Sequence, residues 1–355
     1  MSSELSSLLT SLNPEQQAAA VHTTGPAMVL AGAGSGKTRV LTTRVAWLLK
    51  EQNLLPHSIL LVTFTNKAAG EMKERIQMLT GQVLPYSGTF HSISARILRK
   101  YAHLLGYDQN FTIFDSDDQL ALLKTLYKKY GYDTKQHNPN GVKARISEAK
   151  NELLSPDQLA GISQNTYQET VAKLYAAYAT ELKKQQAMDF DDLLINVVKL
   201  LQEHESVRNF FQQQFEYILI DEYQDTNTVQ YELTRLLSAP QENIFVVGDF
   251  AQSIYAWRGA DYRNMMRLKQ DFNSVAEYRL EQNYRSTQTI LDAATHVISK
   301  TDEHPVLSLW TEKTDSEQIT LIEATTNDTE ASQIINTIQL ELAPKYGYND
   351  IAILY

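Results

Sequence analysis

The stretch Ala-Gly-Ala-Gly-Ser-Gly-Lys-Thr at residues 31–38 constrains the fold of this chain more than any other part of the sequence. It follows an apolar run at residues 27–31 and precedes a helical pattern that starts at Lys37, so its three glycines fall at a strand-to-helix turn. Glycine lets the backbone adopt positive φ and approach a ligand, and the free N–H groups of a helix N-terminus bind anions. The stretch therefore predicts a phosphate-binding loop in an α/β fold.

Each residue of this loop has an expected contact with ATP. Lys37 would neutralise the β- and γ-phosphates, and Thr38 would ligate Mg²⁺ through its hydroxyl. The strict motif has Gly where this chain has Ala31, and a glycine-rich turn that only packs a helix onto a sheet is the alternative interpretation. The residues expected to cradle the phosphates are Gly32, Ala33, Gly34, Ser35 and Gly36.

The composition limits which other chemistry is possible. With 355 residues, of which 43% are hydrophobic, the chain has enough material for two domains with buried cores. It has no Cys, which excludes thiolate sites, and its eight His residues lack the His-x-x-x-His spacing, so the expected metal is a phosphate-bound Mg²⁺. No apolar run approaches the length of a membrane span, and residues 1–11 carry no basic segment, so we expect a cytoplasmic protein without a membrane partner.

The net charge of −10 is unevenly distributed. Residues 281–355 hold 12 acidic and 4 basic side chains, which leaves 30 acidic and 28 basic side chains in the first 280 residues. Two stretches are rich in basic residues and are either solvated helix faces or a surface for a polyanion. They contain Lys67, Lys73, Arg75, Arg96, Arg99 and Lys100, and then Lys124, Lys128, Lys129, Lys135, Lys143, Arg145 and Lys150.

Strands and helices alternate along much of the chain. After a helix that starts at Pro14 with Asn13 as its N-cap, a strand is expected at residues 59–64 and helices at 66–79 and 90–105. This alternation predicts a parallel sheet with crossover helices. Between residues 115 and 214 the periods are helical without a convincing strand, which predicts an all-helical insertion, and strands resume at 217–220 and 243–248.

Two adjacent carboxylates, Asp221 and Glu222, directly follow the strand at residues 217–220. Asp221 would hold Mg²⁺, directly or through water, and Glu222 would orient and deprotonate the attacking water. Two solvated acids at a strand end are the alternative. Asp249 and Gln252 follow the next strand, so polar groups are expected to meet at the edge where open α/β sheets bind ligands.

Aromatic residues lie next to these positions in the sequence. Phe64 follows one strand, Phe90 and His91 follow Gly88-Thr89, and Tyr255 and Trp257 follow the Gln252 loop. Aromatic side chains on such loops can stack on bases without sequence preference, or they can fill the core between subdomains.

Taken together, these blocks resemble the N-terminal half of superfamily 1 DNA helicases of the UvrD/Rep/PcrA type, from about Leu12 to the end of the chain. The resemblance implies two RecA-like cores, ATP hydrolysis and 3′-to-5′ movement on single-stranded DNA. The blocks that carry it are 31–38, Thr63-Phe-Thr-Asn-Lys-Ala-Ala69, Gly88-Thr-Phe-His-Ser92, Asp189-Phe-Asp-Asp-Leu-Leu194, Asp221-Glu-Tyr-Gln-Asp-Thr-Asn227, Gln252-Ser-Ile-Tyr-Ala-Trp-Arg-Gly-Ala260 and Gln282-Asn-Tyr-Arg-Ser-Thr287.

The resemblance also implies residue roles. Gln16 would recognise adenine, although the sequence equally allows an exposed helix residue there, and Arg39 and Tyr284 would pack against the base. Gln252 and Arg285 would sense the γ-phosphate, with Lys37, Glu222, Gln252 and Arg285 forming the catalytic set. The single-strand path would be lined by Thr63, Phe64, Asn66, His91, Tyr255, Trp257 and Arg258. One departure is Phe250-Ala251, since the family typically has a second Asp immediately before this Gln.

The expected domains are a first RecA-like core at residues 1–110 and 190–280, a helical insertion at 111–189, and the beginning of a second RecA-like core at 281–355. Residues 350–355 are expected to be a strand, and the chain is expected to be a truncated, monomeric piece of a helicase that binds single strands and single-strand–duplex junctions. A nucleotide-dependent binding module without motor activity is the alternative. A nucleotide kinase or P-loop regulator would leave the blocks around Phe64, Trp257 and Tyr284 unexplained.

Overall fold

The computed structural model describes residues 3–301, 304–314 and 318–354, apart from the side chains of Ser3, Glu4 and Arg258. Its main sheet has six strands in the order β3-β2-β6-β7-β1-β8, and every neighbouring pair is parallel. The predicted α/β fold with a parallel sheet is therefore confirmed. The strands are β1 (Ala27–Ala31), β2 (Ile59–Thr63), β3 (Ser87–Thr89), β6 (Tyr217–Ile220), β7 (Ile244–Gly248) and β8 (Ala276–Leu280).

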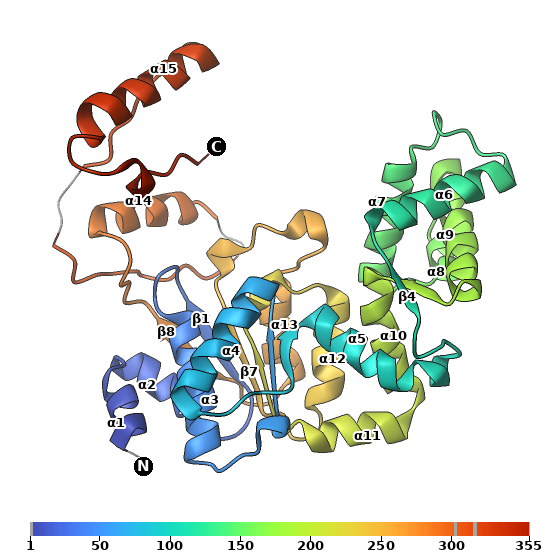
Figure 1. Cartoon of the computed structure of the whole chain (residues 1–355), viewed down its shortest axis with the longest axis horizontal. Helices are drawn as coiled ribbons and strands as arrows, with labels where there is room; N and C mark the ends of the chain where they lie inside the picture. Colours follow the sequence, from blue (N-terminus) through green and yellow to red (C-terminus); the bar gives the residue numbers. More distant parts are fainter. Residues whose placement is uncertain (1–2, 302–303, 315–317, 355) are drawn as a thin grey trace.

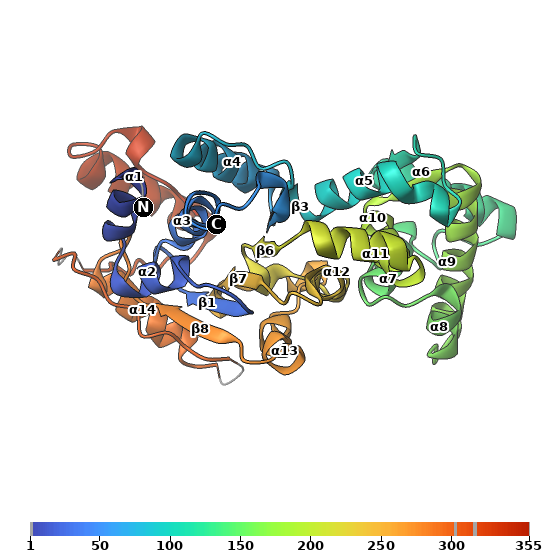
Figure 2. The same ribbon diagram turned by 90° about the horizontal axis from the view of Figure 1, so that it is seen from below.

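Helices cover both faces of this sheet, which is why its central strands are apolar on both sides (Figure 1, Figure 2). Val29, Leu61 and Leu219 pack on one helical layer, and their neighbours along the strands pack on the other. The first layer contains α1 (Ser3–Thr10), α2 (Pro14–Ala20), α3 (Lys37–Lys50) and α4 (Asn66–Thr80). The second contains α5 (Phe90–Tyr101), α10 (Phe190–Glu203), α11 (Glu205–Gln214), α12 (Thr228–Ser238) and α13 (Arg263–Asp271).

The strand register brings the loops that carry the motifs to one edge of the sheet. Leu30 pairs with Gly248, and Val62 pairs with Ile220. Because all these strands are parallel, the loops that follow them leave the sheet at the same carboxyl-terminal edge. Short 3₁₀ helices shape several connections: η1 (Pro56–Ser58), η2 (Ala102–Leu105), η3 (Tyr223–Asp225), η4 (Phe250–Gln252) and η5 (Ala256–Arg258).

Four of the helices between β3 and β6, within residues 116–184, form a separate lobe with its own hydrophobic cluster, which includes Leu126 and Tyr178. This lobe lies beside the sheet, on the side opposite both chain termini (Figure 1). At its base, β4 (Thr112–Phe114) pairs in parallel with β5 (Ala187–Asp189), so the prediction of no strand in this region was wrong. Three-residue strands are too short to show an alternating pattern. The helices are α6 (Ser116–Tyr130), α7 (Pro139–Asn151), α8 (Pro156–Gly161) and α9 (Thr166–Lys184).

The region after β8 packs loosely. It contains α14 (Gln288–Ile298), α15 (Asn327–Thr337), the π-helix η6 (Ile338–Leu342) and the 3₁₀ helix η7 (Tyr348–Asp350). The strand expected at residues 350–355 is absent from the described residues 351–354, and residue 355 lies outside the description. A strand needs a neighbour to pair its backbone groups, and none lies beside this segment among the described residues.

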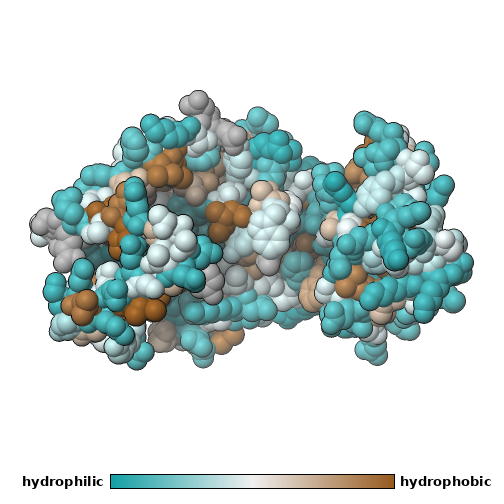
Figure 3. Space-filling view, turned by 90° about the horizontal axis from the view of Figure 1, so that it is seen from above, coloured by the Kyte–Doolittle hydropathy of each residue, from teal (hydrophilic) through white to brown (hydrophobic). Residues whose placement is uncertain are grey.

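Apolar side chains lie exposed over the same region. Leu321 is 84% exposed and Leu354 is 95% exposed. Figure 3, which views the molecule from above, shows apolar patches on the lobe that contains the six-stranded sheet. Among the described residues beyond 286, Leu291 is the only hydrophobic side chain that is buried. None of the described helices combines the length and hydropathy needed to cross a bilayer.

Candidate nucleotide site and nucleic-acid groove

The phosphate loop, residues 32–36, connects β1 to α3 and turns at two left-handed glycines, Gly34 (φ 72°) and Gly36 (φ 88°). Gly36 is also the N-cap of α3, and no side chain caps this helix end. The first N–H groups of a helix have no partner within the helix, so here they are available to an anion. The loop therefore has the backbone geometry expected of a phosphate cradle.

Gln16 is buried against this loop and is hydrogen-bonded to it. It is fully buried, its Nε2 donates to the Ser35 carbonyl at 2.7 Å, and its Oε1 accepts from the Asn13 N–H at 3.1 Å. The alternative of an exposed helix residue is therefore wrong. Both ends of the Gln16 amide bond to backbone groups, so in this state the side chain braces the phosphate loop.

Lys37 and Glu222 form an ion pair across the candidate site, with Lys37 Nζ donating to Glu222 Oε2 at 2.8 Å. Glu222 has φ 51°, a left-handed conformation that is unfavourable for a residue with a side chain. Backbone strain of this kind is typical of functional sites, where the surrounding structure holds it. The conformation directs the Glu222 carboxylate at the phosphate loop, where phosphates would compete with it for Lys37.

Asp221 carries a buried carboxylate oxygen without a partner. The residue is 5% exposed, and its Oδ1 accepts no hydrogen bond. Burial and the neighbouring Glu222 charge raise the pKa of Asp221 to about 7, although Lys37 lowers it. An unpaired buried charge is unfavourable, and Mg²⁺ prefers hard oxygen ligands. This oxygen, with the Thr38 hydroxyl group at the start of α3, is therefore chemically suited to a magnesium ion.

The described residues contain no cluster of three or more His, Asp or Glu side chains placed to hold a metal ion. Magnesium in nucleotide sites is usually bound by one or two protein side chains together with water and phosphate oxygens. Two oxygen groups, the Thr38 hydroxyl and the Asp221 carboxylate, would be compatible with that mode.

Gln224, for which no role was predicted, links the ends of β6 and β7. It is 1% exposed; its Oε1 accepts from the Asp249 N–H at 2.9 Å, and its Nε2 donates to Glu222 Oε2 at 2.9 Å. Asp249 Oδ2 accepts from Gln252 Nε2 at 2.5 Å. Gln252 is thus connected to Glu222 through two buried residues, Asp249, which bonds through both its side chain and its backbone N–H, and Gln224. Glutamine is usually exposed, so only the fold reveals this connection.

A turn at residues 283–285 lies directly on the phosphate loop. The Tyr284 N–H donates to the Gly34 carbonyl at 3.0 Å, and Asn283 Nδ2 donates to the Ala33 carbonyl. A Cβ at Gly34 would lie 2.7 Å from Arg285 Cβ. Arg285, predicted to sense the γ-phosphate, is therefore brought to the loop by the turn that contains it.

The residues predicted to hold the base gather at one side of this loop. Tyr284 OH accepts from Asn13 Nδ2 at 3.0 Å, and Asn13 is the N-cap of the helix that carries Gln16. Arg39 is exposed and donates from Nη2 to the Ser11 carbonyl at 2.9 Å, in the loop between α1 and α2. Arg39, Tyr284 and Gln16 thus surround the same end of α2.

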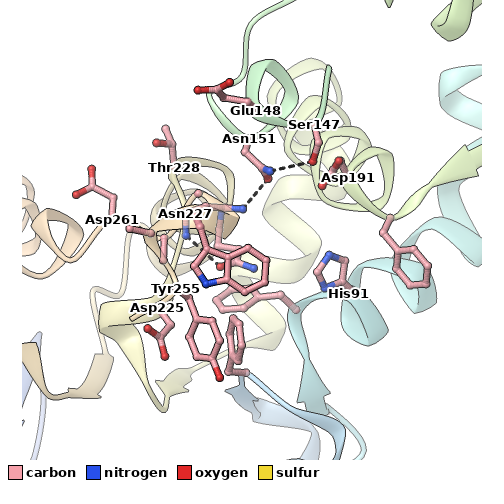
Figure 4. A pocket seen from close by; sticks show the side chains of 18 of the residues that line it. His91, Ser147, Glu148, Asn151, Asp191, Asp225, Asn227, Thr228, Tyr255 and Asp261 are labelled. Atoms are coloured by element: carbon pink, nitrogen blue, oxygen red, sulfur yellow. Dashed lines mark hydrogen bonds between the residues drawn. The ribbon is translucent and has the colours of Figure 1, made fainter. Parts of the chain in front are cut away.

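A groove of about 1200 Å³ opens at the same edge of the sheet, next to the helical lobe (Figure 4). It is lined by six of the seven residues predicted to contact DNA, namely Thr63, Phe64, Asn66, His91, Tyr255 and Trp257. The seventh, Arg258, has its backbone in η5, but its side chain lies outside the described part of the structure.

Aromatic rings form two walls of this groove. Phe64 and Tyr255 stack with ring centres 5.0 Å apart, and Trp257 is 73% exposed beside Tyr255. Across from them, Phe190 is 49% exposed, and its ring lies 5.9 Å from that of His91, whose pKa is lowered by burial. Phe190 lies in one of the blocks that carry the resemblance but was not predicted as a contact; a Phe between two acidic residues was the available signal in the sequence.

The described charges of the groove lining are mostly acidic. Burial and the neighbouring Asp189 raise the pKa of Asp191, one of these acids, to about 6. Acidic side chains repel phosphates, so the contacts that this lining offers to a nucleic acid are those of its aromatic rings with the faces of bases. The acidic lining residues are Glu148, Glu152, Asp191, Asp225 and Asp261, and the basic ones are Arg263 and Arg267.

Lys150, counted in the second basic stretch, is neither solvated nor open to a polyanion. It is 1% exposed and forms ion pairs with Asp189 at 2.7 Å and with Asp192 at 2.6 Å. That expectation was therefore wrong for Lys150. The ion pairs fix the start of α10, so they hold Phe190 at the groove.

A hydrogen bond joins the helical lobe to the sheet loops at the groove. Asn227 Nδ2 donates to Asn151 Oδ1 at 2.7 Å, and Asn151 Nδ2 donates to Ser147 Oγ at 3.4 Å (Figure 4). Asn151 comes from α7, and Asn227 is the N-cap of α12, just after the Asp221-Glu222 loop. The bond thus connects the two lobes that form the groove.

A parallel sheet with a glycine-rich phosphate loop after β1 and an Asp-Glu pair after β6 defines a nucleotide-binding protein of the P-loop class. The comparison with protein families is more specific. Residues 12–273 match the UvrD/REP helicase N-terminal domain, and residues 278–355 match the UvrD-like helicase C-terminal domain. The chain belongs to the UvrD/REP family of superfamily 1 helicases.

Curated relatives agree with this assignment. The chain is 46% identical over 345 residues to an ATP-dependent DNA helicase PcrA of Leuconostoc citreum, covering 96% of this chain and 46% of the relative. It is 43% identical to proteins of the same name from Staphylococcus aureus strain Mu50 over 353 residues and from Bacillus subtilis strain 168 over 351 residues. These matches cover 99% and 98% of this chain and 48% of each relative. The chain thus spans about half the length of the curated relatives it matches.

Proposed function

We propose that this chain is the ATP- and single-stranded-DNA-binding part of an ATP-dependent DNA helicase that moves 3′ to 5′, acting in the cytoplasm at single strands and single-strand–duplex junctions. One observation carries this proposal. In the loop 221–227, Glu222 bonds to Lys37 of the phosphate loop, while Asp225 and Asn227 line the groove. One segment of seven residues therefore reaches both the nucleotide site and the groove, which is the connection that an ATP-driven DNA motor needs.

Each residue of the nucleotide site has a proposed role in binding or hydrolysing ATP. Lys37 would bind the β- and γ-phosphates, Glu222 would accept the proton of the attacking water, and Gln252 and Arg285 would contact the γ-phosphate. Thr38 and Asp221 would hold Mg²⁺, which supplies charge neutralisation between phosphate oxygens when bound. The base would lie near Gln16, Arg39 and Tyr284. The main-chain N–H groups of residues 32–36 would bind the phosphates.

In the groove, bases would stack on Phe64, Tyr255 and Trp257 on one wall and on Phe190 on the other. Thr63, Asn66 and His91 would supply polar contacts, and Arg258 would contact the strand. Stacking is tolerant of sequence because every base has an aromatic face. We therefore propose that DNA is bound without strong sequence preference.

Replacing Trp257 with alanine is expected to weaken binding of oligothymidylate by roughly 5- to 150-fold, since stacking contributes about 1–3 kcal/mol per base. The slope of affinity against salt should not change, because no phosphate contact is removed. Fluorescence anisotropy at several salt concentrations measures both quantities. Tyr130→Ala is the matched control, because Tyr130 is an exposed aromatic residue, 53% exposed, in α6 and does not line the groove. Unchanged affinity in Trp257→Ala would remove Trp257 from the DNA path.

We propose the first core at residues 1–110 and 190–280, the insertion at 111–189 and the beginning of the second core at 281–355, in a chain that acts as a monomer. These boundaries are supported by the separate hydrophobic cluster of α6, α7 and α9 and by the loose packing beyond residue 286.

On its own, this 355-residue chain is expected to hydrolyse ATP slowly, with little stimulation by DNA, and to separate no strands. Arginine placed at the γ-phosphate contributes about 10³–10⁵ in rate, which requires it to be held firmly. Here the backbone of Arg285 is bonded to Asn283, but the residue is exposed and precedes a region with one buried hydrophobic side chain, Leu291, among its described residues. ATPase and unwinding assays on a 3′-tailed duplex measure this. Robust DNA-stimulated turnover or unwinding would contradict it.

The same loose packing favours a second candidate, a nucleotide-dependent DNA-binding module without motor activity. The two candidates differ in whether DNA changes the rate of ATP hydrolysis, so the ATPase assay with and without oligothymidylate distinguishes them.

A further inference from the structure

Asn283 joins two segments of the nucleotide site that are 250 residues apart in the sequence. Its side chain is 2% exposed, and its Nδ2 donates to the carbonyl of Ala33 in the phosphate loop. Its Oδ1 accepts from the N–H groups of Arg285 at 2.8 Å and Ser286 at 2.7 Å. Backbone N–H groups only donate, so these two bonds fix which end of the amide faces the turn and which end faces the loop.

The fit between the turn and the phosphate loop is close. A Cβ at Gly34 would lie 2.9 Å from Asn283 Nδ2 and 2.7 Å from Arg285 Cβ, so the turn fills the space that this glycine leaves open. The Tyr284 N–H adds a second bond, to the Gly34 carbonyl at 3.0 Å. Two consecutive carbonyls of the phosphate loop are thus bonded by two consecutive residues of the turn.

We propose that Asn283 is a positioning residue that sets Arg285 in register with the phosphate loop. One side chain holds the loop through its donor and shapes the arginine-bearing turn through its acceptor, so neither segment can shift without breaking a bond to the other. Asn283 touches no reacting atom in this role. The inference rests on the proposed nucleotide site and adds to it the residue that couples the two halves of that site.

The proposal makes the contribution of Arg285 dependent on Asn283. A bond that braces the phosphate loop affects the binding of ADP and of ATP alike. A correctly placed Arg285, in contrast, strengthens the binding only of the nucleotide with a γ-phosphate. Without Asn283, the N–H groups of Arg285 and Ser286 lose their side-chain acceptor and the turn loses its bond to Ala33, so the backbone of Arg285 is less firmly placed at the phosphate loop. If Asn283 only filled space, its removal would lower the stability of the fold without changing the discrimination between ADP and ATP.

The test is a double-mutant cycle of Asn283→Ala and Arg285→Ala, read by equilibrium binding of ADP and of a non-hydrolysable ATP analogue to the full chain. Arg285→Ala alone is expected to weaken the ATP analogue about tenfold and leave ADP unchanged, as for loss of a charge-assisted contact. In the Asn283→Ala background, Arg285→Ala should have no further effect. Asn283→Asp keeps the acceptor for the turn but loses the donor to Ala33, so it should also reduce discrimination between the two nucleotides.

Asn243→Ala is the matched control. Asn243 likewise bonds backbone groups, accepting from Gly25 N–H and donating to the Glu216 carbonyl, but it immediately precedes β7, at the opposite edge of the sheet from the phosphate loop. It should leave nucleotide discrimination unchanged. If wild type binds nucleotide and the effects of Asn283→Ala and Arg285→Ala simply multiply, the coupling role is wrong. If wild type binds no nucleotide, both this inference and the proposed function are overturned.

Discussion

Replacing Glu222 with glutamine is expected to lower the rate of ATP hydrolysis by about 10²–10⁴-fold, the usual contribution of a general base. The substitution removes the carboxylate that would accept the proton of water while keeping an oxygen for the bonds from Lys37 and Gln224. The fold should therefore be retained. Single-turnover hydrolysis with enzyme in excess over ATP measures this change even when the wild-type rate is low.

The same variant should bind a non-hydrolysable ATP analogue at least as tightly as wild type. In the structure the Glu222 carboxylate is the partner of Lys37 at 2.8 Å, and phosphates must replace it there. A neutral amide competes less well for an ammonium group than a carboxylate does. Glu216→Gln is the control, because Glu216 is an exposed acid just before β6, away from this edge. Loss of rate and of affinity in parallel would show that Glu222 acts in binding and is not the base.

Replacing Lys37 with alanine is expected to weaken binding of the ATP analogue on the order of 100-fold, because a charge-assisted contact to two phosphates in a partly buried site is lost. The Lys37 side chain is 10% exposed, so water replaces its charge poorly. The variant also leaves Glu222 without its cation, next to the incoming phosphates, which adds repulsion. Calorimetric titration in the presence of Mg²⁺ gives the affinity directly.

Lys73→Ala provides the comparison for this experiment. Lys73 is an exposed lysine in the middle of α4 and is not part of the phosphate loop. Its removal changes the net charge equally and should leave nucleotide affinity unchanged. Equal affinities of wild type and Lys37→Ala would mean that the glycine-rich loop only packs α3 onto the sheet.

The sheet and its loops could be predicted because their signals are local. Strands at residues 27–31 and 217–220 were predicted with their observed bounds, and those at 59–64 and 243–248 each proved one residue shorter. The helix expected at 66–79 extends to Thr80, while that expected at 90–105 ends as an α-helix at Tyr101 and continues as 3₁₀. Apolar runs followed by Gly or Asp specify a buried parallel strand and its end regardless of distant contacts.

What the sequence could not provide were contacts between distant segments. The burial of Gln16 depends on its contact with the phosphate loop, and the role of Asn283 depends on Ala33 of that loop, 250 residues earlier in the chain. The charge of Lys150 identified it as basic, but only the fold shows that two aspartates surround it. The prediction of a strand near residue 350 was wrong for the same reason, because an apolar pattern forms a strand only where a neighbouring strand pairs with it.

The central claim, that the groove holds single-stranded DNA, is tested most directly by comparing a labelled oligothymidylate with a hairpin duplex of the same number of nucleotides in anisotropy titrations at rising salt. We expect the single strand to bind more tightly than the duplex at every salt concentration, with affinity for both falling as salt increases. Tighter binding of the duplex, or no binding of the single strand at low salt, would contradict the assignment of the groove.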